Sequence, residues 1–142
     1  MKHIALALLL ALAVVTVGCQ ATSAEPRATL TSGDYALLVG PWEGEWISET
    51  MEGYVTWESN LKLDVFKSGN GRFSEASRNL KWRTKVKIER GMVILNIGRG
   101  AREFIYTKKG NTATLSTIYE GEWEGDLRVV TVMLKKRIVP SQ

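Results

Sequence analysis

The sequence has little of what most enzyme and metal sites require. It contains one histidine, His3, and one cysteine, Cys19, so neither residue occurs after position 19. Ser-His and Cys-His catalysis, Cys/His zinc sites and haem ligated by His or Cys are therefore excluded from 20–142. A disulfide is excluded as well, so a hydrophobic core must supply the stability. We expect a protein that is not an enzyme and that has no metal site and no cofactor.

Long apolar runs are also scarce. The run 4–17 follows Lys2 and His3 and precedes Gly18 and Cys19, and no second run of that length occurs. It is too short to cross a bilayer as a helix, and its layout is that of a secretory signal. The sequence therefore predicts an exported protein without a transmembrane helix.

The segment Thr16-Val17-Gly18-Cys19 resembles the lipobox of bacterial lipoproteins, which are cut before a cysteine that is then acylated, typically with palmitate. The resemblance implies a signal peptide at 1–18 and a lipid anchor on Cys19. Gln20, rather than Asp, implies the outer membrane, facing the periplasm, in a cell with two membranes. The alternative is an ordinary signal peptide that is cut nearby and leaves a stray thiol.

Residues 19–33 are rich in Ala, Thr and Ser and contain Pro26, a composition that predicts a lipidated N-terminus and flexible tether. The domain then occupies 34–142. After a possible helical turn at 34–39, the hydrophobic period is two and turn signals recur. Strands are expected at 42–48, 54–66, 73–79, 82–89, 92–97, 102–108, 112–120 and 127–136, with a polar loop at 121–126.

Eight short strands with short connections predict an all-β fold. Because closing a meander removes its exposed edges, we expect an eight-stranded up-and-down antiparallel barrel. An open meander or a sandwich is the alternative.

The start of the first strand, Gly40-Pro41-Trp42, resembles the Gly-x-Trp signature of lipocalins and the wider calycin group. The resemblance implies a lipocalin-like barrel in which Trp42 plugs the base. It also implies that a basic residue after the last strand packs across the tryptophan. Arg137 matches that position, with Lys136 as the alternative.

The stretch Gly40-Pro-Trp-Glu-Gly-Glu-Trp46 has an echo in Gly121-Glu-Trp-Glu-Gly125, and both contain the tripeptide Gly-Glu-Trp. The first and last strands are neighbours in a closed barrel. We therefore interpret the two copies as marking the seam where the barrel closes.

Charge is unevenly distributed along the chain. Alternate connections of an up-and-down barrel share a rim, so the topology gathers the acidic connections on one rim and Lys67, Arg90, Lys108 and Lys109 on the other. The chain ends leave from the basic rim, so one hypothesis is that this rim faces the anionic membrane surface. The alternative is that both sets are solvated turn charges.

Aromatic residues supply the first candidate site. Inward-facing Trp46, Trp57, Trp82 and Tyr106 could line an apolar ligand pocket. The alternative is plain core packing, since an eight-stranded barrel is just wide enough for side chains to fill it.

Two charged segments are weaker candidates. The acidic loop at 120–126 offers oxygen ligands for Ca²⁺, but its spacing matches no EF-hand, so we interpret it as a solvated turn and expect no metal. The face formed by Arg83, Lys85 and Lys87 could bind nucleic acid. An exported, membrane-anchored protein seldom meets nucleic acid, so no such partner is expected.

These observations lead to two functional hypotheses. The first is a lipid-anchored envelope protein whose barrel binds a small apolar or amphipathic ligand. The second is an envelope interaction, assembly or inhibitor module with a filled barrel, whose partner is another envelope protein. An enclosed cavity of a few hundred Å³ favours the first and a filled interior favours the second. A hydrolase built on carboxylates alone is not expected.

Overall fold

The computed structural model describes residues 29–139. The predicted signal peptide, Cys19 and residues 20–28 of the predicted tether lie outside these residues. The described chain forms one 3₁₀ helix followed by eight strands. They are η1 (Ser32–Leu37), β1 (Gly40–Thr50), β2 (Val55–Val65), β3 (Asn70–Glu75), β4 (Leu80–Glu89), β5 (Met92–Ile97), β6 (Gly100–Lys109), β7 (Thr112–Trp123) and β8 (Asp126–Arg137).

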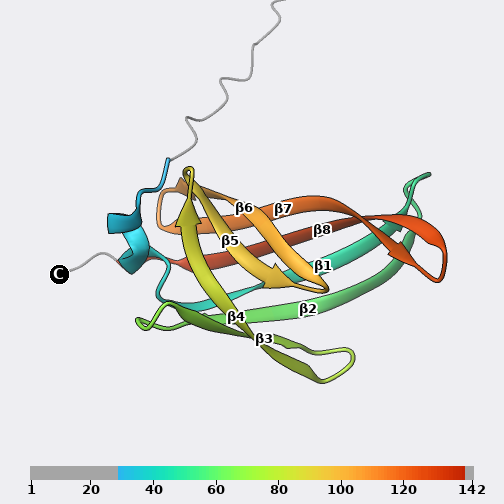
Figure 1. Cartoon of the computed structure of the whole chain (residues 1–142), viewed down its shortest axis with the longest axis horizontal. Helices are drawn as coiled ribbons and strands as arrows, with labels where there is room; N and C mark the ends of the chain where they lie inside the picture. Colours follow the sequence, from blue (N-terminus) through green and yellow to red (C-terminus); the bar gives the residue numbers. More distant parts are fainter. Residues whose placement is uncertain (1–28, 140–142) are drawn as a thin grey trace, which may run out of the picture.

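The strands form a closed barrel in chain order (Figure 1). Each strand is antiparallel to the next, and β1 also pairs with β8 from Glu43↔Lys135 to Thr50↔Arg128. The predicted eight-stranded up-and-down antiparallel barrel is confirmed, and the open meander and the sandwich are wrong. Closure leaves neither terminal strand with a free edge.

Two predicted boundaries, the end of the third strand and the loop before the last strand, are wrong. The third strand was expected at 73–79, but β3 ends at Glu75 and the chain turns, with Asn79 at a φ of 50°. The expected loop at 121–126 is mostly strand, because β7 and β8 pair as far as Trp123↔Asp126. Only Glu124 and Gly125 remain as a turn. Their φ values of 52° and 87° match the type I′ hairpin turn that the right-handed twist of paired strands favours.

The wall of the barrel is least regular beside β4. Its first part pairs with β3 from Lys85 to Leu80, and only its last four residues pair with β5. In the first part, where β4 has no ladder with β5, two side chains of β4 bond to the backbone of β5 instead. The Thr84 hydroxyl accepts a hydrogen bond from the Asn96 amide at 2.7 Å, and Trp82 Nε1 donates to the Asn96 carbonyl at 3.3 Å.

The core follows from the period of two, since alternate side chains of each strand point inward. The largest fully buried side chains include Trp42, Phe73 and Phe104, which lie on three different strands. The helix η1 lies over one end, which we call the base. There the Tyr35 hydroxyl donates to the Phe66 carbonyl at 2.9 Å, and Leu38 is fully buried. The opposite end, at the β1–β2 and β7–β8 turns, we call the mouth (Figure 1).

Candidate functional site

The base is held by one tryptophan and one lysine. Trp42 is fully buried and its Nε1 donates to the Leu38 carbonyl at 2.8 Å. Lys136 Nζ lies 5.4 Å from the centroid of the Trp42 ring and donates to the carbonyls of Leu37 and Val39. Burial lowers the pKa of Lys136. These contacts tie η1 and the start of β1 to the end of β8.

The expectation for Arg137 needs a correction. Lys136, not Arg137, packs across Trp42, and Arg137 is exposed. The reason is that successive side chains of a strand point to opposite faces of the sheet. Leu134 is fully buried, so Lys136 also points inward and Arg137 points outward.

Three of the four residues predicted to bind a ligand meet inside the mouth. The rings of Trp46 and Trp57 are 5.4 Å apart, and those of Trp46 and Trp82 are 6.4 Å apart, both edge to face. Tyr106 is not with them. It is buried near the base, 6.5 Å from the Trp42 ring, and burial raises the pKa of its hydroxyl. The four residues therefore form no single pocket.

Sequence reasoning missed two residues of the mouth, Arg102 and Tyr119. The guanidinium carbon of Arg102 lies 4.2 Å from the centroid of the Tyr119 ring. Arg102 shares the parity of Phe104 and Tyr106, which are buried, so the alternation in the sequence already placed it on the inner face. Its Nε and the Nε1 of Trp46 have no hydrogen-bond partner among residues 29–139. The mouth thus holds polar groups that the surrounding protein leaves unsatisfied.

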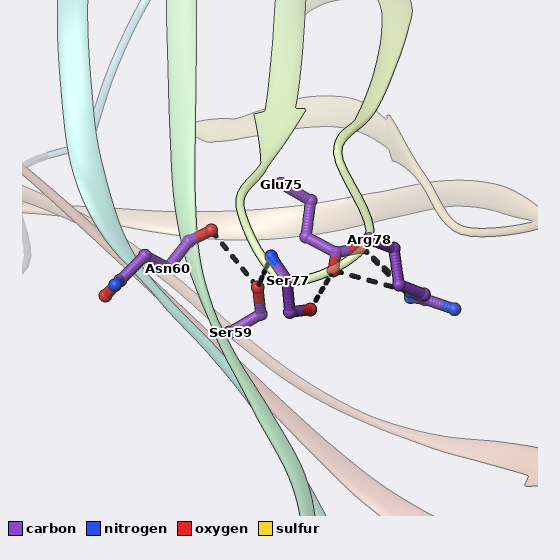
Figure 2. A network of polar contacts seen from close by, with 5 residues as sticks. All are labelled: Ser59, Asn60, Glu75, Ser77 and Arg78. Atoms are coloured by element: carbon purple, nitrogen blue, oxygen red, sulfur yellow. Dashed lines mark hydrogen bonds and ion pairs between the residues drawn. The ribbon is translucent and has the colours of Figure 1, made fainter.

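A buried carboxylate fixes the loop between β3 and β4 (Figure 2). The side chain of Glu75 is 0% exposed and accepts hydrogen bonds from the Ser77 hydroxyl at 2.5 Å and from Arg78 Nη2 at 3.0 Å. Burial raises the pKa of Glu75, but the bonds from Ser77 and Arg78 outweigh burial and hold the pKa below its ordinary value. The Ser77 amide in turn donates to the Ser59 hydroxyl at 3.1 Å, which ties the loop to β2.

Arg78 also joins two tryptophans at the mouth. Its guanidinium carbon lies 4.6 Å from the Trp57 ring centroid and 5.7 Å from that of Trp123. Trp123 belongs to the second Gly-Glu-Trp, at the tip of the β7–β8 hairpin, and is 58% exposed. The two copies of the tripeptide therefore have opposite roles, since Trp46 packs inside the barrel and Trp123 lies on the surface.

Two shallow hollows open on the described part of the chain. One, of about 380 Å³, lies beside η1, and one, of about 360 Å³, lies where β2 meets the β3–β4 loop. Neither is lined by Trp46, Trp82 or Arg102. Toward the base, fully buried side chains such as Trp42, Phe73 and Phe104 fill the barrel. This filling near the base is typical of an eight-stranded barrel.

The outer face around β8 carries apolar side chains where a solvated barrel has polar ones. Val130, Val132 and Leu134 are buried inside, so the alternate residues of β8 point outward. The register places Ile47 of β1 and Ile118 of β7 on either side of Thr131. We call this surface the seam face, and its outward apolar and threonine side chains are Ile47, Ile118, Leu127, Val129, Thr131 and Met133.

Carboxylates border the seam face on both sides. Glu49 of β1 and Glu120 of β7 both pair with Val129, so they flank it from opposite strands. Glu45 lies beside Met133 and Glu122 beside Leu127 in the same register. None of these four carboxylates has an ion-pair partner among residues 29–139. The seam face is thus an apolar strip with a negatively charged border.

The described part of the chain offers no metal-binding cluster. Among residues 29–139, no three His, Cys, Asp or Glu side chains gather closely enough to hold an ion. The acidic residues of 120–126 are instead spread over the arms and the turn of the β7–β8 hairpin. No helix within 29–139 is long and apolar enough to cross a membrane.

Comparisons with known proteins add no family to this description. No protein-family model, no curated protein and no solved structure matches the chain. The candidate surfaces therefore rest on the geometry of the chain itself.

Proposed function

We propose that this chain is a cell-envelope protein, anchored by lipid on Cys19, that binds another protein through the seam face. The observation that carries the proposal is that β8 is apolar on both of its faces, although the barrel needs only the inner one for its core. Contiguous exposed apolar surface on a small soluble domain is typical of a protein contact. The anchor and the envelope location rest on the lipobox-like segment 16–19.

The shape of the seam face resembles the anatomy of a protein interface. Interfaces combine an apolar centre with a polar border that water reaches. Here Val129 and Thr131 are central and half-buried, while Ile118 is 70% exposed at one side. The neighbouring hairpin tips add more exposed apolar side chains, among them Tyr54 and Trp123.

The charges indicate which partner would fit. Four carboxylates border the strip, so an anionic membrane surface or a nucleic acid would be repelled from it. A protein that presents an apolar strip flanked by Lys and Arg would be attracted, and its association would weaken as salt rises. We therefore assign the seam face to a partner protein with a basic border. The likeness of the barrel to lipocalins remains part of the proposal and rests on Gly40-Pro41-Trp42.

Photo-crosslinking in intact cells tests the proposal. A photoreactive amino acid replaces Ile118 on the seam face, and a matched one replaces Lys85, an exposed position on the outer face of β4. We expect a discrete protein adduct from position 118 but not from position 85. The crosslinked peptide of the partner should be apolar and contain Lys or Arg, and the E49K/E120K double variant should reduce the adduct at least about tenfold.

Three results would count against this assignment. Equal adducts from both positions would show an unspecific surface. An adduct with a second copy of this chain would make the seam face a homodimer contact. The absence of any adduct from position 118 would refute the proposal that the seam face binds a protein.

A second candidate function is the binding of a small amphipathic ligand at the mouth. The specific observation in its favour is that Trp46 Nε1 and Arg102 Nε are buried without a hydrogen-bond partner among residues 29–139. A buried unsatisfied donor costs about 1–3 kcal/mol, and a ligand acceptor would remove that cost. Trp57 and Trp82 would supply the apolar contact.

A further inference from the structure

The base hollow lies at the opposite end from the hairpin tips of the mouth. It has a volume of about 380 Å³ and is open to solvent. Its walls come from η1, from the turn between β2 and β3, and from the end of β4 (Figure 1). The lining residues are Ser32, Tyr35, Lys67, Ser68, Gly69, Val86, Lys87 and Ile88.

The lining combines cations with an apolar wall. Lys67 and Lys87 are among the lining residues, and none of the lining residues within 29–139 carries a carboxylate. Lys67 has no ion-pair or hydrogen-bond partner among residues 29–139. Ser32 and Ser68 add hydroxyl groups, while Val86 and Ile88 are apolar. This composition suits an anion that carries an apolar group.

Two carboxylates, Asp34 and Glu89, adjoin lining residues in the sequence, and neither pairs with Lys67. Asp34 accepts hydrogen bonds from the amide and hydroxyl of Thr31 at 2.7 and 2.8 Å, and these bonds lower the pKa of Asp34. Glu89 lies 3.7 Å from Lys87 Nζ, which is a long, exposed contact that contributes little. Lys87 can therefore turn to an incoming anion at small cost.

Two exposed apolar side chains lie on the same chain segments as the lining residues. Phe66 precedes the lining residue Lys67 and is 42% exposed, with Arg72 5.8 Å from its ring centroid. Leu37 of η1 is 43% exposed. Basic and apolar groups that alternate on one surface are typical of segments that lie on anionic lipid.

We propose that the base hollow binds the phosphate of an anionic phospholipid, with Lys67 and Lys87 on the phosphate and Phe66 and Leu37 against the acyl chains. The chain enters the described domain at this end, at Thr29, directly before η1. A lipid bound here orients the barrel with its base on the membrane and its mouth away from it. This site does not depend on the seam face and stands whether or not that face binds a protein.

Binding of soluble short-chain lipids to the full-length processed protein in neutral detergent tests the site. The probes are dihexanoyl phosphatidylglycerol, dihexanoyl phosphatidylcholine and glycerol phosphate, followed by native mass spectrometry and by NMR shifts. We expect phosphatidylglycerol to bind in preference to phosphatidylcholine. The K67Q/K87Q variant should bind it about thirtyfold more weakly, which is the effect of removing two cations close to an anionic lipid.

Matched variants distinguish binding in the hollow from nonspecific electrostatic attraction to the protein surface. K81Q/K85Q removes two exposed lysines that do not line the hollow and should leave phosphatidylglycerol binding unchanged. F66S should weaken phosphatidylglycerol while leaving glycerol phosphate unaffected. All the substituted side chains are exposed, and thermal unfolding checks that each variant is folded.

The outcomes decide between sources of the phosphate. If glycerol phosphate bound as tightly as phosphatidylglycerol, the ligand would be a free phosphate ester and the proposed phospholipid would be wrong. Equal loss in both double variants, or no binding of any probe, would overturn the site itself.

Discussion

At the scale of single residues, the base depends on one inward lysine. Lys136 donates to two backbone carbonyls and lies over the Trp42 ring, while its neighbour Arg137 points to solvent. The two cations are adjacent in the sequence, but the side chain of Lys136 points into the barrel and that of Arg137 points outward. Their contributions to stability should therefore differ sharply.

We expect K136M to lower the free energy of unfolding by about 1–3 kcal/mol, because it leaves the carbonyls of Leu37 and Val39 without their donor. R137M serves as the matched control and should change the free energy of unfolding by less than about 0.5 kcal/mol. Urea unfolding followed by tryptophan fluorescence measures both. Equal destabilisation by the two variants would contradict the role assigned to Lys136.

Glu75 gives the barrel a specific sensitivity to acid. Its pKa is held below its ordinary value of 4.5, so the unfolded chain takes up this proton at a higher pH than the folded protein. The stabilisation is therefore complete above about pH 4.5 and is lost as the pH falls through the folded pKa. The lost interactions are those of the carboxylate with Ser77 and Arg78.

The variant E75Q should be less stable than the natural chain at pH 7, by about 1–3 kcal/mol, because Arg78 loses its charged partner. The difference should shrink as the pH is lowered below 4.5. Thermal unfolding at a series of pH values measures it. Parallel curves for the two proteins down to low pH would show that Glu75 is not the group responsible.

At the scale of elements, the two Gly-Glu-Trp copies show how the same tripeptide is used differently. A Cβ at Gly44 would lie 1.8 Å from the Met133 carbonyl oxygen, so β1 approaches β8 where only glycine fits. A Cβ at Gly121 would meet nothing closer than 3.7 Å. The first glycine is thus part of the seam, and the second is an ordinary strand residue.

We expect G44A to destabilise the protein by about 3 kcal/mol or more, because β1 must move away from β8 to admit the methyl group. G121A should change stability by less than about 0.5 kcal/mol. Chemical denaturation of both variants measures the contrast. A small effect of G44A on stability would mean that β1 and β8 can move apart at little cost in free energy, which would contradict this role of Gly44.

The sequence predicted the elements better than their ends. Alternating residues and glycine turns located all eight strands, since the period of two is a local property. The end of β3 depends on a partner distant in the chain, since the Ala76 amide donates to the Asn60 carbonyl. The length of β7 depends on its pairing with β8, which the polar composition of 121–126 does not indicate. Parity alone could have placed Lys136 and Arg102 inside.

The candidate sites were less predictable than the strands. Trp46, Trp57 and Trp82 do lie together, but the height of Tyr106 along the barrel depends on register, which the sequence pattern leaves open. The seam face was visible as a last strand that is apolar on both faces. Its acidic border required the register of three strands.

At the scale of the whole molecule, the barrel has two chemically different ends. The base carries η1, Lys67 and the chain entry, and the mouth carries long hairpins with the carboxylates Glu122 and Glu124 (Figure 1). A base on the membrane would hold the seam face and the hairpin tips out toward other envelope proteins. The proposed function thus rests on the asymmetric outer surface of the barrel.

We infer that this protein acts through its outer surface and not through the barrel interior. Native mass spectrometry of the natural protein, released from its own envelope with mild detergent, distinguishes these two modes of action. We predict a complex with a second, different protein that dissociates in the E49K/E120K variant. A natural chain that carries a small molecule and no protein, with the small molecule lost in W46A and retained in E49K/E120K, would contradict the account.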